Sequence, residues 1–106
     1  MRVVTQKTVT AFKANKFLSL SNSTVTVMQE LTMYLLFGNI IAIKDNSENT
    51  LTINNCGYRT NTTKERLNGI LQAYNLGYIQ QIKKIWYYVG SDGNKELFTG
   101  RKVFNL

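Results

Sequence analysis

One segment of this chain has the sequence pattern of a helix, and β-type sequence flanks it on both sides. Thr62 and Glu65 have the T-x-x-E spacing of a capping box, in which each side chain accepts a hydrogen bond from the other residue's backbone N–H. Apolar side chains then recur at i, i+3, i+4 and i+7 and so share one helical face: Leu67, Ile70, Leu71 and Tyr74. Gly77 suits a left-handed helix cap. We therefore predict an amphipathic helix over about Thr62–Asn75.

The segments before this helix alternate apolar and polar residues, as strands with one buried face do. Gly38 and Asn39 tolerate the positive φ of a two-residue turn, which predicts a hairpin between Leu31–Phe37 and Ile40–Lys44. The other elements expected in this part are a weak first strand at Thr5–Phe12, a loop at Asn15–Asn22, a strand at Thr24–Val27, a turn at Asp45–Asn49, and a strand at Thr50–Ile53 with Leu51 and Ile53 facing the core.

The segments after the helix are also β-type. Tyr78–Ile82 and Ile85–Val89 form either a second hairpin or one bent strand, because Lys83-Lys84 is a poor turn sequence. Gly90–Asn94 is rich in turn residues, and two short strands are expected beyond it, at Glu96–Thr99 and Lys102–Phe104.

These elements predict one α+β domain over residues 1–106: an antiparallel β-meander packed against one amphipathic helix, with C-terminal strands completing the sheet. The helix is too short to be stable in isolation, so its apolar face should lie against the sheet.

The composition argues against an enzyme. The chain has no histidine, which removes Ser-His-Asp and Cys-His nucleophiles, histidine metal sites and histidine general bases together. Its single cysteine, Cys56, is most simply a small residue at a strand end. The six acidic residues are scattered, and no local pattern suggests a carboxylate metal site. We expect a non-catalytic protein without a metal or another cofactor.

The charge balance favours anionic partners. Thirteen Lys and Arg residues against six acidic residues give a net charge of +7, which suits nucleic acid or an acidic protein surface, although small basic proteins also gain solubility in this way.

No segment approaches the length of an apolar membrane span, and the first residues lack the apolar region of a signal peptide. We therefore expect an intracellular protein without membrane contact.

Two groups of residues are candidates for binding. Arg59, Lys64 and Arg66 surround the helix start, where cations and free backbone N–H groups would form a phosphate site; a solvated, capped helix end is the alternative. Arg66 should point away from the apolar face. In the Ile85–Val89 strand, alternation should place Trp86 and Tyr88 inside.

The same alternation places Tyr87 outside, beside Lys83 and Lys84. An aromatic ring flanked by lysines suits an RNA backbone or an acidic protein groove, and a sheet aromatic without a ligand is the alternative.

Three ordered motifs carry a resemblance: Tyr34–Ala42 (YLLFGNIIA), Gly57–Gly69 (GYRTNTTKERLNG) and Ile79–Tyr87 (IQQIKKIWY). Together they resemble a family of small, mostly uncharacterised proteins encoded by phages and prophages. The resemblance covers roughly residues 24 to 89. The segments outside it, Met1–Leu20 and the tail beyond Val89, could carry functions that relatives lack.

A phage origin implies a binding function by class analogy, since small phage proteins commonly block host defence or nucleic-acid machinery. The first hypothesis is an inhibitor in the host cytoplasm that binds a host protein or protein–RNA complex, such as a CRISPR effector with its guide RNA, as anti-CRISPR proteins do. The second is a basic protein that binds RNA or single-stranded DNA directly. The binding residues expected in either case are Arg59, Lys64, Arg66, Lys83, Lys84 and Tyr87.

Overall fold

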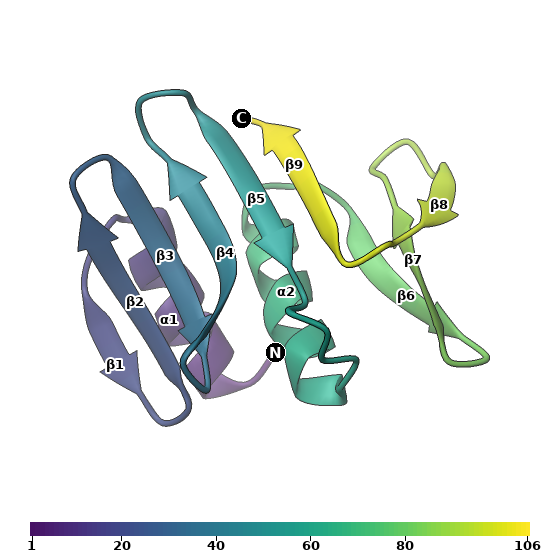
Figure 1. The fold of residues 1–106 in the computed structure, drawn as a ribbon, viewed down its shortest axis with the longest axis horizontal. Helices are drawn as coiled ribbons and strands as arrows, with labels where there is room; N and C mark the ends of the chain where they lie inside the picture. Colours follow the sequence, from purple (N-terminus) through teal and green to yellow (C-terminus); the bar gives the residue numbers. More distant parts are fainter.

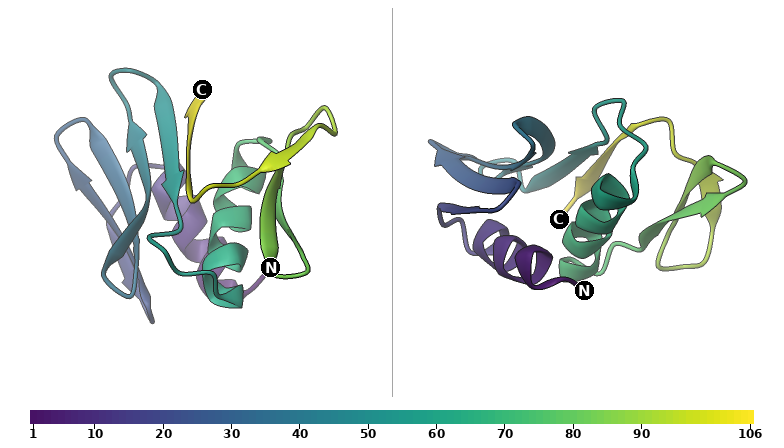
Figure 2. Two further views of the ribbon diagram at one scale, coloured as in Figure 1. Left: turned by 45° about the vertical axis from the view of Figure 1, so that its right-hand side comes forward. Right: turned by 90° about the horizontal axis from the view of Figure 1, so that it is seen from below.

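In a computed structural model, which describes residues 1–106, a six-stranded antiparallel sheet carries two helices on one face, and a three-stranded antiparallel sheet stands beside it (Figure 1). In chain order the elements are α1 (Val3–Lys13), β1 (Leu18–Leu20), β2 (Ser23–Met28), β3 (Leu31–Leu36), β4 (Asn39–Asp45), β5 (Thr50–Asn54), α2 (Asn61–Ala73), β6 (Tyr78–Ile82), β7 (Ile85–Val89), β8 (Lys95–Leu97) and β9 (Arg101–Asn105). The large sheet has the order β1-β2-β3-β4-β5-β9, and the small sheet has the order β6-β7-β8. Both helices lie on the same side of the large sheet, and α2 also packs against β6 (Figure 2). The predicted α+β class with a meander sheet is confirmed, but the fold contains two helices rather than one.

The N-terminal segment is helical, so the strand predicted at Thr5–Phe12 is wrong. The side chains of Thr5, Thr8, Val9 and Phe12 are buried, at the i, i+3, i+4 and i+7 spacing of a helix. This face packs against α2 and against β1, β2 and β3. The polar threonines on it hid the helical period from a hydrophobicity pattern. The Asn15–Asn22 loop also contains a short edge strand, β1.

The central helix was predicted with a small shift and the wrong cap. It spans Asn61–Ala73, and its N-cap is Thr60, whose hydroxyl accepts a hydrogen bond from the Thr63 backbone N–H at 3.1 Å. Thr62 does not cap the helix, and Glu65 instead contacts Arg66 and Thr5. The apolar stripe is confirmed, because Leu67, Ile70 and Leu71 are fully buried.

The meander from β2 to β5 agrees with the predicted strands. The β3–β4 hairpin forms, but its turn is Phe37-Gly38, with φ of +50° and +78°, one residue earlier than expected. Leu51 and Ile53 are fully buried, as the alternation in β5 predicted.

The C-terminal strands divide between the two sheets. β9 pairs with β5 and completes the large sheet, whereas β8 pairs with β7. Of the two alternatives for the segment after α2, the hairpin is correct, since β6 and β7 pair across the Lys83-Lys84 turn.

A single core cluster joins both helices and both sheets. Its members are Val9, Ala11, Phe12, Val25, Tyr34, Leu36, Ile41, Ala42, Leu51, Ile53, Leu67, Ile70, Leu71, Ile79, Trp86, Phe98 and Phe104.

Lys44 is also buried. Its ammonium group donates hydrogen bonds to two carbonyls at the C-terminal end of α1, those of Phe12 and Lys13, at 3.0 and 3.1 Å. A third donation, to the Tyr74 hydroxyl at 3.0 Å, satisfies the cation. Burial, together with the nearby charge of Lys13, holds the pKa of Lys44 below its usual value.

Candidate partner-binding surface

The first turn of α2 brings one predicted cation to the small sheet. Thr60 starts the helix, and Lys64 follows on its exposed side within reach of β6. The Lys64 ammonium group donates to the Gln81 side-chain oxygen at 3.0 Å. Arg59 is exposed in the loop before the helix, and no hydrogen bond or ion pair joins it to the sheet. The two cations at this helix end therefore have different environments.

Arg66 does not face solvent as the sequence analysis expected. It is 2 % exposed, and its guanidinium group donates to Thr5, Ser23 and Asn22 at 2.7, 3.2 and 3.2 Å. It also forms an ion pair with Glu65. The reason is α1, which packs against α2 and widens the buried stripe beyond the apolar residues. Arg66 is thus a structural residue inside the fold.

The β6–β7 turn presents Lys83 and Lys84. Their φ angles are +52° and +68°, so both residues occupy the left-handed region that a type I′ hairpin turn requires. Asparagine and glycine are the usual occupants of this turn, because L-residues with longer side chains are strained there. Both lysines are exposed and form no ion pair. Two cations are held at the tip of the hairpin at a conformational cost.

The pairing register places alternate side chains of the small sheet on its solvent side. The first rung contains Tyr78, Lys95 and Val89, of which Val89 is buried. The middle rung contains Gln80, Tyr87 and Leu97, and the rung next to the turn contains Ile82 and Ile85. The opposite side carries Trp86, which is buried, and Tyr88, which packs against the core. The predicted orientation of Trp86, Tyr87 and Tyr88 is therefore confirmed.

Apart from the buried Val89, this side of the small sheet is unusually apolar for an exposed surface. The exposed fractions of Tyr78, Ile82, Ile85 and Leu97 are 47, 39, 43 and 59 %. Tyr87 is partly exposed, and the Lys95 ammonium group lies 5.7 Å from the centre of its ring. We call this region the β6–β8 surface and define it by Tyr78, Ile82, Lys83, Lys84, Ile85, Tyr87, Lys95 and Leu97.

The predicted site residues are thus only partly brought together. Lys83, Lys84 and Tyr87 lie on the β6–β8 surface. Lys64, on α2, contacts Gln81 of β6 on the opposite side of the small sheet, and Arg59 and Arg66 also lie outside the surface. Sequence reasoning also considered Tyr78 as an aromatic contact, and it missed the other members: Ile82, Ile85, Lys95 and Leu97. The members on β6 and β7 could have been predicted from the alternation of side chains along a strand, which puts Tyr78, Gln80 and Ile82 on one side of β6. Lys95 and Leu97 depend on the pairing of β8 with β7.

The chemistry available elsewhere is limited. No group of three or more Cys, Asp or Glu side chains could hold a metal ion. Cys56 donates its thiol hydrogen to the Ile40 carbonyl at 3.0 Å, and burial raises the pKa of this thiol. Neither helix is long and apolar enough to cross a membrane.

A family model described as Kyanoviridae Gp96 protein matches residues 1–104. The chain belongs to this phage protein family. The phage origin implied by the resemblance is thereby confirmed. The Gp96 family match also includes Met1–Leu20 and almost all of the tail beyond Val89, so these segments are family features rather than additions of this chain. The comparisons with curated proteins and with solved structures found no match.

Proposed function

We propose that this phage protein is a small, non-catalytic inhibitor that binds a host nucleic-acid–protein machine through the β6–β8 surface. The observation that carries the proposal is the exposure of Tyr78, Ile82, Ile85 and Leu97 on one sheet face beside a lysine pair. Contiguous apolar groups rimmed by charges are typical of protein–protein interfaces. The site of action would be the host cytoplasm, and an anti-CRISPR-like target, such as an effector–guide RNA complex, fits this description.

The aliphatic side chains of the surface favour a protein contact. Ile82, Ile85 and Leu97 fill protein pockets well but offer no π-face for a base to stack on. Lys83, Lys84 and Lys95 form no ion pair within the chain, so they are free to meet carboxylates or phosphates. A partner with an apolar patch and an acidic rim matches both features.

Affinity capture with paired variants tests this proposal. Leu97→Asp places a charge at the most exposed apolar side chain of the surface and should abolish capture of the partner from a host lysate. Met28→Asp is the matched control, because Met28, on the large sheet, is similarly exposed, at 63 % against 59 % for Leu97. The captured complex should also lose its activity when wild-type protein is added. Capture that is equal with wild type, Leu97→Asp and Met28→Asp would refute the proposal.

Direct binding of single-stranded nucleic acid is the second candidate, because Lys95 lies over the Tyr87 ring and two further lysines, Lys83 and Lys84, form the tip of the same hairpin. Base stacking on Tyr87 would contribute ~1–3 kcal/mol per base, and each neutralised phosphate would contribute about −0.7 to the slope of log affinity against log salt. Tyr87→Ala should therefore weaken binding even at high salt, whereas Lys83→Ala should mainly flatten the slope. Equal binding of RNA and heparin, unchanged by Tyr87→Ala, would exclude this candidate.

A further inference from the structure

The outer edge of β9 has no neighbouring strand. β9 is the last strand of the large sheet, and it lies between β5 and the small sheet (Figures 1 and 2). Free strand edges are prone to pair with other chains, and folds normally shorten, bulge or cover them. The edge of β9 is five residues long and contains no bulge in its pairing with β5.

The pairing pattern identifies which backbone groups are free. Just beyond the β5–β9 ladder, the Leu106 N–H donates to the Asn49 carbonyl at 2.8 Å. Because alternate residues of an antiparallel strand face the same neighbour, the N–H and C=O of Phe104 point toward β5. Those of Val103 and Asn105 point outward, where the chain provides no strand to receive them.

The other three sheet edges are protected. The edge of β6 is covered by the Asn68 carboxamide, which accepts from the Ile79 N–H at 2.6 Å and donates to the Ile79 carbonyl at 3.1 Å. The edge strands β1 and β8 are only three residues long. β9 is therefore the one long edge without such protection.

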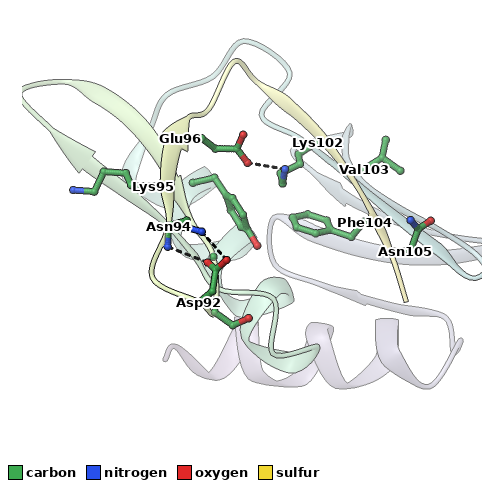
Figure 3. A pocket seen from close by; sticks show the side chains of 11 residues that line it. Asp92, Asn94, Lys95, Glu96, Lys102, Val103, Phe104 and Asn105 are labelled. Carbon is green, nitrogen blue, oxygen red and sulfur yellow. Dashed lines mark hydrogen bonds and ion pairs between the residues drawn. The ribbon is translucent and has the colours of Figure 1, made fainter.

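A cavity of about 660 Å³ lies along this edge (Figure 3). Residues 102–105 of β9 form one wall. The other wall is formed by Tyr88, Gly90, Ser91, Asp92, Asn94, Lys95 and Glu96. In Figure 3, Lys102 and Glu96 reach toward each other across it, and their ion pair measures 2.7 Å. A strand that pairs with β9 would run about 4.8 Å from it. The cavity therefore lies where a strand added to β9 would run.

We propose that an extended, acidic peptide segment of a partner protein adds to β9 as a further strand of the large sheet. The main-chain groups of Val103 and Asn105 supply the pairing, as in other cases of strand addition. The net charge of +7 on the whole chain favours an acidic segment. The cavity itself is lined by Asp92 and Glu96 as well as by Lys95 and Lys102; Lys102 is paired with Glu96, and Lys95 has no ion pair. A second copy of the chain is disfavoured, because it brings the same net charge. The inference concerns the opposite side of the small sheet from the β6–β8 surface, and Lys95 is the one residue that borders both.

Amide hydrogen exchange measured by NMR on the full chain tests the inference. The probe is a short synthetic peptide of alternating valine and glutamate. At a peptide concentration about ten times its Kd, exchange at Val103 and Asn105 should slow about tenfold. The amides of Lys102 and Phe104, which face β5, should keep their rates. This alternation distinguishes strand addition from peptide binding elsewhere.

Val103→Pro should abolish binding without unfolding the chain, because it removes an outward N–H and leaves the ladder to β5 in place. Val103→Thr keeps the N–H and should bind normally. If Val103→Pro fails to fold, a peptide methylated on its backbone nitrogens replaces it as the non-pairing probe. Three results would overturn the inference: binding without protection of Val103, equal affinity for a lysine-containing peptide, or protection that depends on protein concentration alone.

Discussion

The Arg66 guanidinium group donates a hydrogen bond to the Thr5 hydroxyl at 2.7 Å and so joins α2 to α1. Ser23 and Asn22 accept two further hydrogen bonds from the same group, and Glu65 supplies the counter-charge. A buried guanidinium group requires such a set of acceptors, because an unpaired buried charge is costly. One side chain therefore connects both helices to the β1–β2 turn.

Arg66→Ala should lower the free energy of unfolding by about 3–5 kcal/mol, because it breaks this buried network and leaves Glu65 without its partner. This reverses the expectation from sequence that Arg66 is a surface residue. Urea denaturation measures the effect. Lys64→Ala is the control, and it should cost less than about 1 kcal/mol, since Lys64 is partly exposed and makes a single side-chain contact. A loss for Arg66→Ala as small as that for Lys64→Ala would contradict the account.

Thr60→Ala should destabilise the protein by about 0.5–2 kcal/mol, because the Thr60 hydroxyl caps α2. Thr62→Ala changes the same residue type one position inside the helix, where no capping bond is lost. Thermal melting of both variants separates the two positions. An equal or larger effect at Thr62 would show that the capping box predicted from sequence is the true cap.

The differences between sequence and structure have a common cause. Local periodicity was sufficient for α2 and for the β2–β5 meander, whose turns and apolar alternation agree with one another. It failed at α1, where buried threonines replace apolar residues, and at Arg66, whose burial depends on α1. The same dependence on remote contacts explains the candidate site. Alternation located Tyr87, but only the pairing of β8 adds Lys95 and Leu97.

Replacing the hairpin turn should separate stability from binding. Lys83→Asn combined with Lys84→Gly supplies the preferred type I′ residues and removes left-handed strain of about 1–2 kcal/mol per residue. The double variant should melt at a higher temperature than wild type and bind its partner more weakly, with a smaller dependence on salt. Melting curves and binding at two salt concentrations give both readouts. Higher stability with unchanged binding would remove the two lysines from the interface.

Cys56 should react slowly with a thiol reagent at mildly alkaline pH. Burial raises its pKa, so the reactive thiolate is scarcer in the folded protein than in the unfolded chain. The thiol has a higher pKa in the folded protein than in the unfolded chain. Its contribution to the free energy of unfolding is therefore fully present at a pH below the pKa in the unfolded chain, and it is lost as the pH rises through the pKa in the folded protein. The rate of labelling in buffer and in denaturant measures the difference. Equal rates would indicate an open thiol.

The β6–β8 surface is the central claim, and hydrogen–deuterium exchange of the protein bound to its captured partner tests it most directly. We expect slower exchange in β6, β7 and β8 on binding, with Leu97→Asp removing both the complex and the protection. The β2 and β3 strands, which carry the control residue Met28, should exchange at the same rate with and without partner. Protection confined to β2 and β3, with β6–β8 unchanged, would contradict the account.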